Sequence, residues 1–236
     1  MRKNNLLLLT LLITSIATGF SFAASPPQNS GNSQEQKGAD EEAARLYRRL
    51  ASLPMRDRRT IFNSLTPEAK SGLWKVHLRS YVTRHPDLTE EQREAIQSTI
   101  PLITPGLFAT PQGTPEWQTN VHQPLQRLTE KFLEVFSPKV AAELLEMLGG
   151  PEPPQQMQAP DGPSIIKSSL RRAQEMQCTC STQSDWCSSH HGKGWRCVHG
   201  SGACSQTFSG CGTLLVYSCV GQCFNADGPV MEEGNS

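Results

Sequence analysis

The first 177 residues of this 236-residue chain contain no cysteine. Neither sign of charge predominates, because 22 basic side chains balance 22 acidic ones. This balance excludes a nucleic-acid-binding protein that works mainly by neutralising phosphates. Hydrophobic residues make up 36% of the chain and aromatic residues only 6%, which is little for one large globular enzyme. The composition therefore predicts two unlike parts and no nucleic-acid partner.

Long apolar runs are absent beyond residues 1–23, which have the features of a signal peptide. Arg2 and Lys3 form its basic start, residues 6–16 are apolar, and small residues precede a cleavage site after Ala23. The apolar run is shorter than the roughly 20 residues that a membrane span needs, so we favour cleavage over an uncleaved anchor. We expect an exported protein, secreted or periplasmic, with no transmembrane anchor after signal removal.

Sequence motifs of catalytic sites are also lacking. The chain has no Gly-x-Ser-x-Gly, no phosphate-binding glycine loop and no His-Glu-x-x-His. The acidic pairs Glu41-Glu42 and Glu90-Glu91 are interpreted as first turns of helices, where negative charge suits the helix dipole. The sequence therefore predicts a protein that is not an enzyme and that uses no cofactor.

Helical periodicity begins after a polar stretch at residues 24–39, which is expected to be a flexible leader. Asp40 could cap the first helix, residues 66–68 begin another with proline at its first position, and residues 89–92 form a capping box. Residues 40–149 are thus expected to form about five or six short amphipathic helices. This helical domain contains no cysteine and is expected to fold on its own.

Residues 150–177 begin as a linker rich in proline and glutamine, and their second half could form one short helix. Such linkers are usually extended and accessible to proteases. The pair Arg171-Arg172 offers a processing site within it. Residues 225–236 are expected to be a disordered tail.

Eight cysteines gather in the segment that follows this linker. They amount to about 17% of that segment, well above the roughly 8–10% that marks a disulfide scaffold. The even count and the export signal predict four disulfides, whose pairing the sequence leaves open. We expect a small module of loops and short strands, with residues 214–217 as the clearest strand. The cysteines are Cys178, Cys180, Cys187, Cys197, Cys204, Cys211, Cys219 and Cys223.

A zinc site is the competing interpretation of this cysteine block. Cys187 and Cys197 lie near His190, His191 and His199 at spacings that zinc tolerates. Paired Cys-x-x-Cys motifs are missing, however, and an exported protein favours oxidised cysteines. We therefore expect no metal, and interpret the three histidines as exposed loop residues.

Aromatic side chains are frequent in the same block. In so small a module some of them must be exposed, and exposed aromatic residues mark contact sites for partners or membrane interfaces. The expected contact residues are Trp186, Trp195, Phe208, Tyr217 and Phe224.

The run CTCSTQSDWC at residues 178–187 is followed by ACS at 203–205, SGCGT at 209–213 and Val-Tyr at 216–217. In this order the segments resemble the fulvocin C-related family of bacteriocins, and all eight cysteines can be placed in register. The resemblance covers residues 178–224, about a fifth of the chain. Two features depart from the family: the loop between the third and fourth cysteines is longer, and the last two cysteines are further apart.

Helical segments at residues 65–68, 73–75 and 88–92 are also similar to longer members of that family. The resemblance implies an exported bacteriocin-like precursor. Its helical part would be a pro-domain, and its module would be released by cleavage in the linker to act on the envelope of a target cell. The alternative is a periplasmic or cell-surface interaction protein that keeps the module as a permanent binding domain for a periplasmic protein. Cleavage in the linker distinguishes the two.

Overall fold

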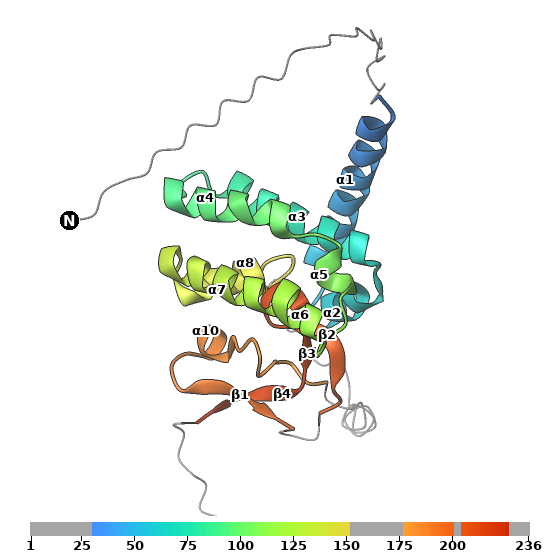
Figure 1. The fold of residues 1–236 in the computed structure, drawn as a ribbon. Helices are drawn as coiled ribbons and strands as arrows, with labels where there is room; N and C mark the ends of the chain where they lie inside the picture. Colours follow the sequence, from blue (N-terminus) through green and yellow to red (C-terminus); the bar gives the residue numbers. More distant parts are fainter. Residues whose placement is uncertain (1–29, 152–176, 201–203, 227–236) are drawn as a thin grey trace, which may run out of the picture.

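A computed structural model describes residues 30–151, 177–200 and 204–226 (Figure 1). Helices form its N-terminal part and short strands with disulfides form its C-terminal part, so the expected fold class is confirmed. The predicted signal peptide, the predicted cleavage site after Ala23, the Arg171-Arg172 pair and most of the expected linker and tail lie outside the described residues. Within the described part, no helix combines the length and apolarity needed to cross a membrane.

The helical part has more helices than the five or six expected. The prolines and glycines that follow residue 100 start new short turns instead of forming a plain loop, because proline is accepted at the first position of a helix. The helices are α1 (Ser30–Ala51), α2 (Met55–Ser64), α3 (Pro67–Arg84), α4 (Glu90–Thr99), η1 (Ile100–Leu102), α5 (Gly106–Ala109), α6 (Pro115–Trp117), the π-helical turn η2 (Gln118–His122), α7 (Gln123–Val135) and α8 (Pro138–Leu145).

Helix starts follow the capping signals of the sequence. The Thr66 hydroxyl accepts a hydrogen bond from the amide of Ala69 at 3.3 Å. The capping box at the start of α4 is complete, because Thr89 and Gln92 each accept a bond from the other's backbone amide. These predictions are confirmed because a cap depends on only four neighbouring residues.

The start of α1 differs from the prediction. The helix begins at Ser30, so residues 30–39 are helical and do not form a flexible leader. The segment lacks apolar periodicity, but its glutamine, glutamate and lysine residues are good helix formers. Polarity alone therefore did not exclude a helix.

The C-terminal module contains two small antiparallel sheets, in which β1 pairs with β4 and β2 pairs with β3. The expected strand at residues 214–217 is wrong except for its last residue, because Leu214 and Leu215 lie in η4, Val216 follows η4 outside any strand, and β3 begins at Tyr217. The strand β4 also includes Asn225 from the expected tail. The elements are α10 (Cys187–His191), β1 (Trp195–His199), β2 (Thr207–Cys211), η4 (Thr213–Leu215), β3 (Tyr217–Cys219) and β4 (Gly221–Asn225).

The module and the helices share one hydrophobic core. The module packs against α2 and α8 and is hydrogen-bonded to α7 between Thr213 and Thr129, and its apolar side chains continue the buried cluster of the helices (Figure 1). The two parts are therefore not separated by a solvent-exposed boundary, and the independent folding of the helical part stays a prediction. The module residues in the shared core are Trp186, Leu214, Leu215, Val216 and Tyr217.

His77 is a buried polar group within the helical part of this core. Its Nδ1 lies 3.1 Å from the Tyr47 hydroxyl, and its Nε2 lies 3.1 Å from the carbonyl oxygen of Glu143. These partners suit a neutral ring that donates from Nε2 and accepts at Nδ1. Burial lowers the pKa of His77 from 6.5 to about 4.

Acidification is therefore expected to destabilise the protein through His77. The unfolded histidine binds a proton near pH 6.5, whereas the folded one resists protonation until about pH 4. Its contribution is complete above pH 6.5 and decreases by about 3 kcal/mol as the pH falls to about 4. Urea unfolding at a series of pH values measures this decrease. His77→Gln should make the free energy of unfolding less dependent on pH between 6.5 and 4. His199→Gln, at an exposed position, is the control and should keep the dependence. Equal pH dependence in the two variants would contradict the assignment to His77.

Candidate functional site

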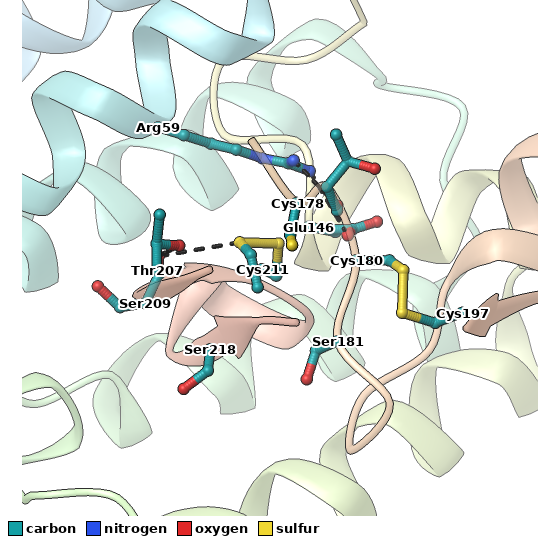
Figure 2. Close-up of a disulfide and its surroundings, with 12 residues drawn as sticks. Arg59, Glu146, Cys178, Cys180, Ser181, Cys197, Thr207, Ser209, Cys211 and Ser218 are labelled. Atoms are coloured by element: carbon teal, nitrogen blue, oxygen red, sulfur yellow. Dashed lines mark hydrogen bonds and ion pairs between the residues drawn. A yellow bond between two sulfur atoms is a disulfide. The ribbon is translucent and has the colours of Figure 1, made fainter. Parts of the chain in front are cut away.

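All eight cysteines of the module form disulfides, as expected. Two of the bridges start from Cys197 and Cys223, which lie opposite each other in the register of β1 and β4. Figure 2 shows the Cys180–Cys197 bridge, which ties the start of the module to β1. Such bridges hold a small segment together mainly by restricting its unfolded chain. The pairs are Cys178–Cys204, Cys180–Cys197, Cys187–Cys223 and Cys211–Cys219.

The cysteines of the alternative zinc site are bonded in disulfides, so they cannot supply the thiolates that zinc binds. The sulfurs of Cys180, Cys187 and Cys223 lie within 4.8 Å of one another, but they belong to two adjacent disulfides and offer no thiolate. The histidines do not converge on them either. His191 lies against the ring of Trp195, with ring centroids 4.6 Å apart.

Asp185 organises the loop that carries the third and fourth cysteines. Its two carboxylate oxygens accept hydrogen bonds from the amides of Cys187 and Cys197, at 2.8 and 2.7 Å. This role of Asp185 was not among the predictions from the sequence. The first bond is an Asx-turn, which the spacing of two residues could have indicated.

The five expected contact residues divide into two groups. Trp186 and Tyr217 are buried, so the prediction that they contact a partner is wrong. Phe208 is 95% exposed on β2, Phe224 is 44% exposed on β4, and Trp195 is half-buried. The prediction assumed a module standing alone, whereas the docked module buries two of its aromatic side chains.

The buried aromatic residues hold the module on the helices. The ring of Tyr217 packs edge-on against Trp117, with centroids 5.6 Å apart, and its hydroxyl lies 3.2 Å from Nδ1 of His122. The Nε1 of Trp186 donates to the Thr213 hydroxyl, which also lies 2.9 Å from the Thr129 hydroxyl on α7. The junction is thus both apolar and hydrogen-bonded.

A charged group crosses the same junction. The buried Glu146, just after α8, lies 3.8 Å from Nη2 of Arg59 on α2 (Figure 2). Its carboxylate also lies 2.5 Å from Nε2 of His190 on α10. Arg59 also donates to the carbonyl oxygen of Thr179 in the module. His190 is exposed, as expected, but it lies on α10 and not in a loop, and its ring contacts Glu146 of the helical part.

The turn before β3 has an unusual backbone. Leu214 and Leu215 both have φ near 56°, in the left-handed region where a non-glycine residue is strained by roughly 1 kcal/mol. Both side chains are fully buried in the shared core, which stabilises each by about 2 kcal/mol. The docked arrangement therefore stabilises a turn that the module alone would not favour.

Grooves lie along the junction between the module and the helices, and two of those found among the described residues exceed 300 Å³. The first, of about 350 Å³, lies between α7 and residues 183–189 and includes Glu130 and Asp185 in its lining. The second, of about 380 Å³, lies between α5 and the strands β2 and β3. Each is lined by both parts of the molecule, so neither exists unless the module is docked.

Comparison with family models, curated proteins and solved structures gives no match to this chain. The resemblance to the fulvocin C-related family therefore stays a prediction from the residues quoted above.

Proposed function

We propose that the chain is an exported, non-enzymatic interaction protein that keeps its cysteine-rich module docked as a permanent binding part. One observation carries this proposal: the module buries apolar side chains, Tyr217 among them, inside the core of the helices. Four disulfides suit such a role, because they persist in oxidising compartments. The exposed Phe208 and Phe224 supply the surface for a periplasmic or envelope partner.

Release of the module would expose its share of the core to water. Exposing each large apolar side chain costs roughly 1.5–3 kcal/mol, so the five module residues together represent about 7–15 kcal/mol. This apolar burial is of the same size as the roughly 4–15 kcal/mol that the association of two separate pieces costs, and the hydrogen bonds and the ion pair at the junction add to it. The antibacterial-precursor interpretation requires the opposite behaviour, namely a module that leaves after cleavage.

Cleavage followed by size-exclusion chromatography tests the proposal. A site-specific protease sequence placed between residues 152 and 176 allows the covalent connection to be cut, and no disulfide joins the module to the helices. We expect both pieces to elute together.

Intact mass of the secreted chain should show one species beginning after Ala23, about 8 Da lighter than after reduction because of four disulfides.

The matched variant is Tyr217→Ala, which removes the ring that packs against Trp117 and should weaken co-elution. A cut module that elutes alone, or a secreted 178–224 fragment that inhibits bacteria, would contradict the proposal. Either result would favour the bacteriocin-like precursor.

A further inference from the structure

The second groove at the junction has the size and lining of a small-molecule site. Its volume of about 380 Å³ falls within the roughly 300–1,000 Å³ that is usual for ligand pockets. Its walls are mainly apolar and aromatic. Phe62, Phe108 and Trp117 come from the helical part, and Phe208 and Val216 come from the module.

Lys70 on α3 is the single charged residue in the lining of this groove. The neighbouring helix positions one turn away are Thr66, Pro67, Leu73 and Trp74, so none provides a carboxylate. The described residues show no ion pair to Lys70, whose Nζ lies 5.4 Å from the centroid of the Phe62 ring. Partial burial lowers the pKa of its ammonium group, and an anion would relieve that loss of hydration.

The side-chain amide of Gln112 also lines the groove, but its hydrogen-bonding groups are already paired within the protein. The Gln112 amide donates to the carbonyl oxygens of Phe208 and Val216, and its carbonyl accepts from the Ser218 hydroxyl at 2.7 Å. These bonds hold the loop after α5 against the module. Lys70 is therefore the charged group that the groove can offer to a ligand.

We propose that this groove binds a small apolar carboxylate, with the carboxylate at Lys70 and the apolar body between Phe108 and Phe208. Charge complementarity selects the anionic group, since no acidic residue lines the groove. The same arrangement accounts for Phe208, a phenylalanine left 95% exposed at the rim of an apolar groove. The inference rests on the docked module of the proposed function, because both parts form the walls.

Calorimetric titration of the full, disulfide-bonded chain tests this inference, with octanoate as the probe and octanamide as its neutral counterpart. We expect octanoate to bind about tenfold more tightly, because a hydrogen bond to a charged group is stronger than a neutral one. Lys70→Met should reduce the preference to about twofold or less. Lys139→Met, at an exposed position outside the groove, should retain it.

A second pair of variants tests the apolar part of the site. Phe208→Ala should weaken octanoate and octanamide by similar factors of about three to ten, whereas Phe224→Ala, on the other sheet, should change neither. Both side chains are exposed, so neither change should prevent folding.

Equal binding of the two probes, an unchanged preference in Lys70→Met, or no octanoate binding would overturn the inference. The cleavage experiment separates this failure from that of the proposed function. If the cut pieces still elute together while octanoate does not bind, only the ligand assignment is wrong.

Discussion

Replacing Arg58 with methionine is expected to lower the free energy of unfolding by about 3–5 kcal/mol. Arg58 lies on α2 and is fully buried. Its guanidinium donates hydrogen bonds to backbone carbonyls from two distant parts of the chain. The acceptors are the carbonyl oxygens of Ala51, Leu53, Leu148 and Gly150.

The expected size of the effect follows from the carbonyl groups that the variant leaves behind. These groups lie at the end of α1 and after the end of α8, where a helix has no amides of its own left to pair them. A buried polar group without a partner costs roughly 1–3 kcal/mol, and methionine replaces the volume of arginine but none of its donors. Arg58 thus joins the end of α1 to the segment that follows α8.

Urea unfolding followed by circular dichroism measures this loss. Arg48→Met on α1 is the matched control, because Arg48 is exposed and its replacement should change stability by less than about 0.5 kcal/mol. Arg58→Lys should lie between the two, since lysine keeps the charge but cannot reach four acceptors. A loss below about 1 kcal/mol for Arg58→Met would show that the carbonyls find other partners.

The helix starts of this fold were predictable from the sequence, because each depends only on residues that are close together in the chain. The starts of α3 and α4 depend on a cap and the three residues after it, all of which are visible in the sequence. Four disulfides were predictable from composition for a similar reason, because a short segment with few apolar residues needs covalent support. Their pairing was not, since eight cysteines carry no information about which of them meet.

The conformation of Leu214 and Leu215 could not be predicted in the same way. An apolar run that ends in valine and tyrosine favours a strand, yet the left-handed backbone of both leucines depends on helices far away in the sequence. The apolar residues 214–217 nevertheless indicated how the module is placed. Consecutive large apolar residues in a module too small for its own core indicate that the module packs on something else.

The contacts of Glu146 across the junction also could not be predicted from the sequence. Its partners Arg59 and His190 lie on α2 and α10, far before and after it in the chain. Each of the three residues alone is an ordinary surface residue by type. Only the docked arrangement of the module brings them together.

Removing the module is expected to destabilise the helical part more than any single substitution. A chain that ends before Cys178 loses the side chains that cover Trp117 and the inner face of α7. It also loses the hydrogen bonds from Asn63 and Gln112 to the module. The five removed module side chains contribute roughly 7–15 kcal/mol of apolar burial to the shared core, which is as large as the total stability of a typical domain, and the helix side chains that they cover become exposed.

The shortened chain should therefore show helical circular dichroism without a cooperative thermal transition, although its helices have good caps. In the full chain, near-ultraviolet signals of the tryptophans and far-ultraviolet helix signals should be lost together, because Trp186 and the helices share a core. Leu215→Ala should lower the free energy of unfolding by about 2–4 kcal/mol, and the two signals should give the same value. Phe208→Ala should leave the free energy of unfolding unchanged by either signal. A shortened chain that keeps the midpoint of the full chain would mean that the core is divisible after all, and the module would then be free to act as a released effector.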